Sequence, residues 1–384
     1  MNLQFNDRSI TVAIVGCGGF VGCHLLNAIL CRTKWRVFGV DLDFYRILDK
    51  LNNERCDFLC GDLADPAVVE RIAKFPVVVN LAAICTPSRY MAEAAAVIRS
   101  NYDHPVALAE ACAKSGSWLI HFSTSEIYGR TAGDSGLLDE DTTPVILGPV
   151  AASRWSYATA KLLTERYIAG LPGLKWTVVR PFNFVGPYMD FMPGVDGEGI
   201  PRVLANFSSA LVRGEPMKLV NGGVARRSFT SVYDAVDFMF ALFAAGSGRQ
   251  LNMAEAGGTS EFTDSPAYSQ AFNVGNPDNE LTIAELAQRM RKIYASIKGV
   301  AVESVPVPVE VSGEAYYGVG YDDSLRRLPS VGKAERMLGF RAATPIDECL
   351  RDSLTWFVEH YSVDAAAFAD KDSAALADKD CAAG

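Results

Sequence analysis

The segment TVAIVGCGGFVG, residues 11–22, decides how this chain folds. Its β-branched start predicts a buried strand over 10–16, and the next residues predict a helix over 20–32. Between the two elements the glycines recur at every third position. Such a turn lets backbone N–H groups and a helix N-terminus approach a pyrophosphate, because side chains there would block it. The pattern predicts a dinucleotide site formed by Gly16, Gly19, Phe20, Val21 and Gly22.

Asp41 extends this pattern, because it closes the next predicted strand, 36–41, about 20 residues beyond the turn. An acid at this place accepts hydrogen bonds from both hydroxyls of an adenosine ribose and repels a 2′-phosphate. It therefore favours NAD over NADP. An ordinary surface Asp at a strand end is also compatible with the sequence.

Short apolar runs continue through the first half of the chain and alternate with stretches long enough to be crossover helices. Strands are predicted at 56–62, 76–83, 117–124 and 176–183, and helices at 65–74, 91–115 and 154–170. Runs apolar on both faces are typical of parallel strands covered by helices. The sequence therefore predicts an α/β fold with a Rossmann-type, doubly wound parallel sheet.

After Asn183 glycine and proline become frequent and interrupt the pattern of strands and helices. This change predicts a smaller C-terminal α/β domain for the substrate. We expect the cofactor domain at 1–185, with segments near 225–245 and 270–276 returning to it, and the substrate domain at 186–362. An amphipathic helix is predicted from Ile283. The polar stretch 246–269 is interpreted as a surface insertion, and 363–384 as a disordered tail.

Composition excludes several classes of protein. The net charge of −9 disfavours nucleic acid and anionic membrane surfaces as partners, and the sequence has neither a signal-peptide pattern nor an apolar run long enough to span a bilayer. We therefore expect a cytoplasmic protein. Nine cysteines without a Cys-x2-Cys pair, and four histidines, predict free thiols and no metal site.

Two further motifs carry chemistry. Ser123-Thr124-Ser125-Glu126 ends the fifth predicted strand, and Tyr157-x3-Lys161 lies on a predicted helix with both side chains on one face. A nearby ammonium and an oxidised nicotinamide are expected to lower the pKa of the Tyr157 phenol and make it a base near neutral pH. A Tyr-x3-Lys is expected by chance about once in such a chain, so its weight comes from the order of the motifs.

That order resembles the extended short-chain dehydrogenase/reductase family, the NAD-dependent epimerases and dehydratases of nucleotide sugars, over about residues 10–360. The resemblance implies that Thr124, Tyr157 and Lys161 are catalytic and that Asn183 reaches the sugar diphosphate. It also implies a homodimer paired through helices near 91–115 and 154–170. Further cofactor contacts are implied for Asp62, Leu63, Leu81, Ala82 and Ala83.

Finer features resemble the branch of this family that decarboxylates UDP-glucuronic acid. They are Glu126, the stretch GPVAASRWSYATAK, and a Tyr-rich segment with Tyr317 and Asp323 that leads to Arg327. A carboxylate substrate needs a cation, for which Arg154 and Arg327 are the candidates. Either arginine is also compatible with a surface or ion-paired role. Tyr317 and Asp323 are assigned to substrate binding.

Three longer stretches, 80–90, 189–216 and 320–330, resemble the plant enzymes of that branch that make UDP-apiose and UDP-xylose. The resemblance gives Cys85 a catalytic role and pairs it with Tyr90. It places Arg202, Lys218 and Arg227 near the UDP moiety, although a solvated surface cation is the alternative. The other eight cysteines are predicted to be small buried thiols.

Ser125, a predicted substrate contact, stands where the plant enzymes have cysteine, and the loop near 246–269 is longer. The expected activity is the NAD-dependent conversion of UDP-glucuronic acid into UDP-apiose, UDP-xylose or both. Three alternatives stay open: a decarboxylase that yields only UDP-xylose or the 4-keto-pentose, another nucleotide-sugar epimerase or dehydratase, and a nucleotide-binding protein without turnover.

Overall fold

The structure is a computed structural model that describes residues 10–130, 136–247, 265–318 and 321–361. The predicted tail at 363–384, most of the predicted insertion at 246–269 and one glycine of the Tyr-rich segment, Gly320, lie outside the described residues.

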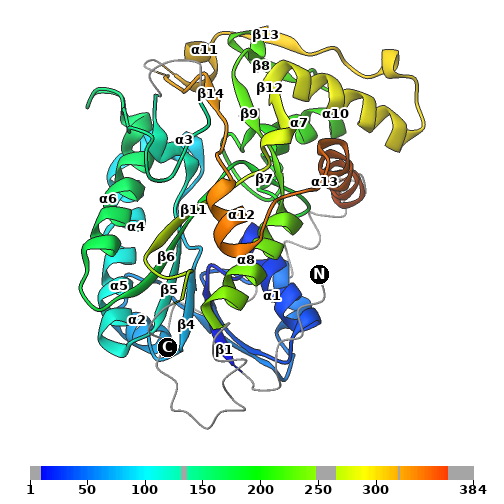
Figure 1. The fold of residues 1–384 in the computed structure, drawn as a ribbon. Helices are drawn as coiled ribbons and strands as arrows, with labels where there is room; N and C mark the ends of the chain where they lie inside the picture. Colours follow the sequence, from blue (N-terminus) through cyan, green and yellow to red (C-terminus); the bar gives the residue numbers. More distant parts are fainter. Residues whose placement is uncertain (1–9, 131–135, 248–264, 319–320, 362–384) are drawn as a thin grey trace.

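A seven-stranded sheet forms the centre of the molecule, in the order β11-β6-β5-β4-β1-β2-β3 (Figure 1). Every neighbouring pair is parallel. The predicted α/β class with a doubly wound parallel sheet is therefore confirmed. The strands are β1 (Thr11–Val15), β2 (Arg36–Asp41), β3 (Cys56–Cys60), β4 (Val77–Asn80), β5 (Trp118–Phe122), β6 (Lys175–Pro181) and β11 (Gln270–Val274).

Helices cover both faces of this sheet, which explains why its strands are apolar throughout. Along β1, Ala13 and Ile14 are fully buried but belong to two different clusters, one on each side of the sheet. On one side lie α1 (Phe20–Arg32), α8 (Val232–Ser247) and α12 (Gly332–Leu338). On the other side lie α2 (Pro66–Ile72), α4 (Ala94–Asn101), α5 (Asp103–Ser115) and α6 (Ser156–Gly170).

The prediction of one helix over 91–115 was wrong. The chain instead forms α3 (Pro87–Ala92), α4 and α5, and the last two meet at Tyr102, whose φ of −126° and ψ of −64° are not helical. Pro105 lies in the first turn of α5, where its missing N–H costs nothing. In a continuous helix the Pro105 ring would clash with the carbonyl four residues earlier.

Apart from α8, β11 and α12, the C-terminal half packs at the carboxyl end of the sheet, in the upper right of Figure 1. Its amphipathic helix begins at Ile283 as predicted, behind a capping box made by Thr282 and Glu285. The two-domain division itself stays a prediction. The helices are α7 (Val203–Val212), α10 (Ile283–Lys298), α11 (Gly313–Tyr317) and α13 (Ile346–Tyr361), and the strands are β7 (Phe184–Val185), β8 (Lys218–Val220), β9 (Arg226–Ser228), β10 (Thr230–Ser231), β12 (Glu280–Thr282), β13 (Val309–Val311) and β14 (Arg326–Arg327).

Eight cysteines lie in the described ranges, and all eight are free. Five are buried as predicted, whereas Cys31 and Cys60 are exposed, so the prediction of a buried thiol was wrong for these two. Cys85 is exposed as well. Among the helices of the described residues, none is long and apolar enough to cross a bilayer.

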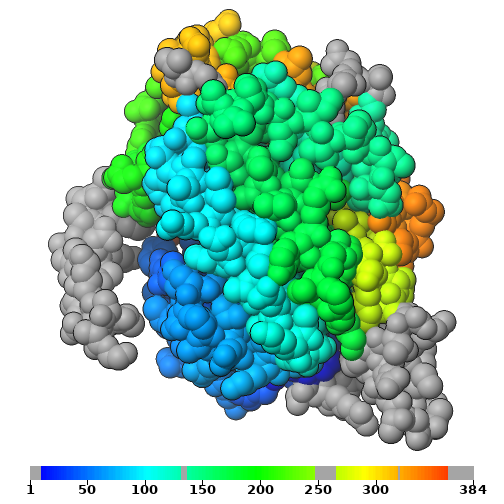
Figure 2. Space-filling model, turned by 90° about the vertical axis from the view of Figure 1, so that its left-hand side faces the viewer, coloured from blue at the N-terminus to red at the C-terminus, as the bar shows by residue number. Residues whose placement is uncertain are grey.

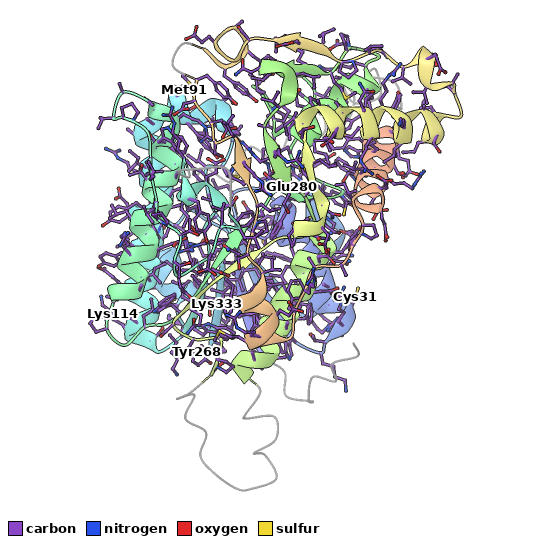
Figure 3. All side chains as sticks on the ribbon, turned by 45° about the horizontal axis from the view of Figure 1, so that its top comes forward. Cys31, Met91, Lys114, Tyr268, Glu280 and Lys333 are labelled. Atoms are coloured by element: carbon purple, nitrogen blue, oxygen red, sulfur yellow. The ribbon has the colours of Figure 1, made fainter. Side chains whose placement is uncertain are left out.

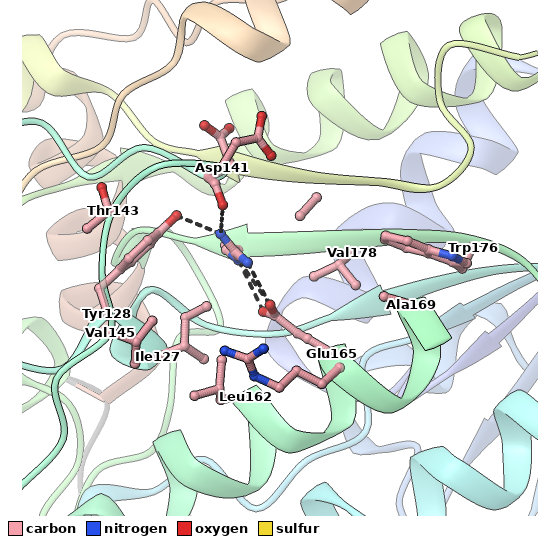
Figure 4. Close-up of a pocket in the computed structure, with 14 residues that line it drawn as sticks. Ile127, Tyr128, Asp141, Thr143, Val145, Leu162, Glu165, Ala169, Trp176 and Val178 are labelled. Carbon is pink, nitrogen blue, oxygen red and sulfur yellow. Dashed lines mark hydrogen bonds and ion pairs between the residues drawn. The ribbon is translucent and has the colours of Figure 1, made fainter. Parts of the chain in front are cut away.

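A buried ion pair ties α6 to the sheet. Arg180 on β6 donates to Glu165 on α6 at 2.7 Å and to the hydroxyl of Tyr128 at 2.8 Å, and Tyr128 donates to Asn273 on β11 at 2.8 Å. Figure 4 shows the bonds of Arg180 to Glu165 and to Tyr128 at the wall of a cavity of about 290 Å³. Because Tyr128 ends the short helix η2 (Ser125–Tyr128), the pair fixes η2 and α6 relative to each other.

Replacing Glu165 with Ala should therefore strongly destabilise the protein. The substitution leaves the buried Arg180 charge without its partner, at a cost of about 3 to 5 kcal/mol in the free energy of unfolding. Asp57→Ala is the matched control, because the Arg36–Asp57 pair is exposed and should contribute less than about 1 kcal/mol. Urea unfolding measures both. Equal losses in the two variants would contradict the role given to the buried pair.

Candidate active site

The glycine turn lies at the carboxyl end of β1 and is held by close backbone contacts. Gly16 has φ +85°, and its N–H donates to the carbonyl of Val40 at 2.8 Å. A Cβ on Gly22 would come within 2.1 Å of the carbonyl oxygen of Gly16, so α1 packs against the turn only because residue 22 is glycine. The N-terminus of α1 then begins directly at the turn, capped by no side chain.

Asp41 holds this turn from the end of β2. Its carboxylate accepts from the N–H of Gly18 at 2.8 Å and from the N–H of Leu42 at 2.7 Å. Gly18 is not one of the three regularly spaced glycines from which the dinucleotide site was predicted, yet it is packed more tightly than Gly19. A Cβ on Gly18 would lie 2.0 Å from the carbonyl oxygen of Asp43, whereas one on Gly19 would meet its nearest neighbour at 3.2 Å.

The remaining predicted cofactor residues border the same edge of the sheet. Leu81 and Ala82 follow β4, and a Cβ on Gly16 would lie within about 3 Å of their backbone atoms. Ala83 is half-buried next to them. Asp62 and Leu63 follow β3, where the Asp62 side chain is largely exposed and Leu63 is buried.

The predicted trio converges behind the ends of β4 and β5. Tyr157 and Lys161 lie on one face of α6, and both are buried. Lys161 donates to the carbonyl of Phe122 at the end of β5 at 2.8 Å, and Thr124 hydrogen-bonds Tyr157. The Tyr157 ring stacks on the ring of Tyr90, with centroids 4.7 Å apart and planes 10° from parallel.

The expected lowering of the Tyr157 pKa is not found in the chain alone. Burial raises this pKa well above its usual value, the nearby Cys85 and the carboxylate of Glu126 raise it further, and the bond from Thr124 only partly offsets them. Lys161 is affected in the opposite sense, since burial lowers its pKa to about 8. Lys161 does not offset these influences in the chain alone, so Tyr157 needs additional positive charge from what binds beside it to act as a base.

Cys85 lies after β4, at the carboxyl edge of the sheet. Its side chain is exposed, and its carbonyl accepts from the Tyr90 hydroxyl at 2.8 Å. The structure thus brings Cys85, Tyr90 and Tyr157 together, because Tyr90 contacts both of the others.

Five charged side chains form a buried cluster beside this trio. Arg154 donates to Glu126 at 2.7 Å and pairs with Asp323 at 3.4 Å. Arg227 contacts Asp323 at 2.8 Å, and Arg327 contacts Glu126 and Asp323 at 3.6 and 3.9 Å. Burial works to raise the pKa of each carboxyl, but the arginines outweigh it and lower both, so Glu126 and Asp323 are ionised.

The other predicted substrate residues lie on several different elements. Ser125 is buried in η2, the Asn183 amide donates to the carbonyl of Ser228 at 2.7 Å, and Tyr317 stacks on Tyr321. Lys218 is exposed beside the ring of Tyr316. Arg202 pairs with Asp190, a residue that sequence reasoning missed, because nothing in its local pattern distinguishes it from other loop acids.

Comparisons with known proteins agree with this geometry. Residues 12–254 match the model of the NAD dependent epimerase/dehydratase family. The chain belongs to that family. NAD is its cofactor, and the turn fits a dinucleotide, since Gly16, Gly18 and Gly22 keep side chains out of the junction between β1 and α1.

Individual relatives extend the likeness over most of the chain. The chain is 37% identical to a UDP-D-apiose/UDP-D-xylose synthase of Oryza sativa subsp. japonica, over 90% of this chain and 89% of that protein. It is 37% identical to UDP-D-apiose/UDP-D-xylose synthase 1 of Arabidopsis thaliana, over 91% of both. Among solved structures, the PbgP3 protein from Burkholderia pseudomallei is 30% identical with a TM-score of 0.78, over 94% of this chain and 99% of that chain.

Gly18→Ala should weaken NAD binding by at least about tenfold, or about 1.4 kcal/mol. The new methyl group would collide with the Asp43 carbonyl and push the turn away from β2 and Asp41. Gly170→Ala is the control, because a Cβ there meets nothing within 4 Å. Calorimetric titration with NAD+ measures both, and unchanged affinity in Gly18→Ala would contradict the packing argument.

Proposed function

We propose that this protein converts UDP-glucuronic acid into UDP-apiose and UDP-xylose through a 4-keto intermediate. The observation that carries the proposal is the joint presence of a Tyr–Lys pair, a buried arginine cluster and an exposed thiol at one sheet edge. The names of the plant relatives support the same activity.

Gly16, Gly18, Gly19 and Gly22, with Asp41, are the residues proposed to hold NAD. When bound, NAD supplies an oxidant that accepts hydride from the sugar and later returns it, so it is not consumed. In the first step Tyr157 takes the proton of the sugar 4-hydroxyl, and Thr124 orients that hydroxyl. Lys161, whose ammonium is fixed by the Phe122 carbonyl, supplies positive charge behind the phenol.

The arginine cluster is suited to a substrate carboxylate. Three guanidinium groups face two carboxylates, which leaves one positive charge in excess. In a buried site that excess attracts an anion, and Arg327 retains one buried N–H, on Nε, with no acceptor. A carboxylate β to the 4-ketone loses CO2 because the bonding electrons pass into an enolate, and Arg327 or a water then protonates the carbon with help from Glu126.

Cys85 is proposed to act after CO2 is lost. Retro-aldol opening of the C2–C3 bond and closure to a branched ring require one proton to leave a sugar hydroxyl and another to reach a new one. The Cys85 carbonyl accepts from Tyr90, whose ring stacks on Tyr157, and the Cys85 side chain is exposed to whatever binds at this edge. Re-reduction of the rearranged sugar gives UDP-apiose, and direct re-reduction gives UDP-xylose.

The alternative is an enzyme that makes only UDP-xylose or releases the 4-keto-pentose. One observation favours it: Ser125 is a hydroxyl where the plant enzymes are expected to carry a thiol, and it is buried next to Glu126. The product mixture separates the two proposals.

Tyr157→Phe should reduce CO2 release from UDP-glucuronic acid by on the order of 10²-fold or more, since oxidation at C4 precedes it. Binding of NAD and of the UDP-sugar should persist, because only a hydroxyl is removed. Tyr167→Phe, on the same helix, loses an exposed phenol that bonds Glu110 and serves as control. Normal decarboxylation by Tyr157→Phe would exclude the assigned role.

Cys85→Ser should abolish most of the branched product while CO2 release continues. The pKa of the Cys85 thiol is raised above its ordinary value, but a thiol is still a far stronger acid than a serine hydroxyl and exchanges its proton more readily near neutral pH. The main product should become UDP-xylose or the 4-keto-pentose, which NMR of the product mixture would show. Cys60→Ser is the matched control with an exposed thiol elsewhere. An unchanged product ratio in Cys85→Ser would assign Cys85 a packing role.

We further propose that the protein is a cytoplasmic homodimer that pairs through the face of α4 and α6, seen in Figure 2. Ile98 on α4 and Leu163 on α6 are 41% and 47% exposed, so this face offers apolar side chains that a second copy could cover. Leu163→Glu should give monomers by light scattering, whereas Leu325→Glu, a change at another exposed leucine, should not. A monomeric wild type at micromolar concentration would refute the proposal.

A further inference from the structure

The loop that follows β7 is fastened to the cofactor-binding half at three points. His24 on α1 bonds the carbonyl of Pro187 at 2.9 Å. Arg46, from the short helix η1 (Tyr45–Lys50) after β2, donates to the carbonyls of Tyr188 at 3.2 Å and Asp190 at 2.7 Å. Tyr188 and Asp190 have φ of +64° and +56°, conformations that need such support in residues other than glycine.

Asp190 in turn fixes Arg202, which precedes α7. One Asp190 oxygen accepts from the Arg202 backbone N–H at 2.7 Å, and the carboxylate also accepts from the Arg202 guanidinium, with Nε at 2.9 Å. The guanidinium carbon lies 5.8 Å from the centre of the Phe20 ring, at the first residue of α1. Arg202 is therefore held at the glycine turn.

The same segment touches the loop that carries Cys85. A Cβ on Gly199 would lie 2.8 Å from the hydroxyl of Ser88 on α3, the helix that begins two residues after Cys85. The charge of Arg202 acts on the Cys85 thiol and on the Tyr90 phenol. The guanidinium of Arg202 thus lies beside Phe20 at the cofactor turn, and the segment that carries it, at Gly199, borders the helix that follows Cys85.

We propose that Arg202 is the cation that stabilises the thiolate form of Cys85, and that Asp190 is a positioning residue that seats Arg202 there and partly balances its charge. The role of Arg202 rests on the proposed function only for the reaction in which Cys85 gives up its proton. The effect of Arg202 on the thiol itself does not depend on that function. Loss of the Cys85 proton to a sugar oxygen leaves a negative sulfur, which Arg202 stabilises until the proton returns.

Electrostatics support the assignment. Although Cys85 is exposed at the surface of the chain, the protein around it desolvates the thiol and raises its pKa, and Arg202 is the strongest influence that lowers this pKa. Lys161 lowers it further, whereas Asp190 and Glu126 raise it. Tyr90 and Tyr157 also face the thiol and are neutral, because burial raises both of their pKa values well above the usual range. Arg202 and Asp190 therefore act on the thiol with opposite signs.

The test is the pH dependence of Cys85 alkylation by iodoacetamide in the absence of substrate, followed by mass spectrometry of the peptide that contains it. Arg202→Gln should raise the thiol pKa and slow alkylation at pH 7 by about threefold or more, and Asp190→Asn should lower the pKa and accelerate alkylation. Arg202→Lys keeps the charge and should fall between wild type and Arg202→Gln.

Cys31 and Cys60 are internal references in the same digest, since both are exposed. Figure 3 shows Cys31 on the opposite side of the molecule from Met91, which lies on α3, so its alkylation rate should not change in any variant. If Cys31 or Cys60 reacts at a different rate in a variant, that variant is partly unfolded. The comparison is then made with Arg202→Lys and Asp190→Glu, which keep the charges and disturb the structure less.

Opposite shifts in Arg202→Gln and Asp190→Asn would support the proposal. Shifts in the same direction, or none, would overturn it and leave the pair a structural tie. This outcome is independent of the product, because the alkylation is measured without a sugar nucleotide. If the wild type makes no UDP-apiose, the proposed function fails while the thiol shifts still decide the role of Arg202.

Discussion

The parallel pairing of β1 with β4 is the constraint on which the site depends. The helix that follows β1, α1, covers one face of the sheet, whereas α4 and α5, which follow β4, cover the other face. The loops after β1 and β4 therefore diverge at the carboxyl edge and leave space for a ligand. The turn at Gly16 follows β1, and the loop to Cys85 follows β4. Because β5 pairs with β4, Thr124 and Glu126 emerge beside them. Residues far apart in the sequence thus meet without any local signal that joins them.

Charge burial is the second constraint, and it links the C-terminal half to this edge. Arg227 and Arg327 come from the neighbouring strands β9 and β14, and Asp323 precedes β14. They meet Arg154 and Glu126 from the first half of the chain. Buried charges are tolerated only when they are paired, so the two halves hold each other in register through these contacts. The one positive charge left over suits an anionic substrate.

Much of the fold followed from sequence pattern, because buried parallel strands are apolar on both faces and crossover helices must lie between them. The strand over 36–41 and the helix over 20–32 have the predicted bounds. The split at Tyr102 escaped prediction, since a proline at the first turn of a helix is compatible with either a kink or a new start. The expected fall in the Tyr157 pKa depends on an oxidised nicotinamide and stays a prediction, whereas in the chain alone this pKa is raised. Local spacing gives the direction of the Lys161 side chain, but burial, which dominates this pKa, depends on the tertiary structure.

The measurement that tests the account most directly is NMR of the products formed from UDP-glucuronic acid and NAD+ by the wild-type protein. We expect CO2 release and a mixture that contains UDP-apiose beside UDP-xylose, with no net consumption of NAD+. UDP-xylose or the 4-keto-pentose without UDP-apiose would contradict the role of Cys85 in ring rearrangement. Unchanged UDP-glucuronic acid would contradict the assignment of the arginine cluster and of Tyr157.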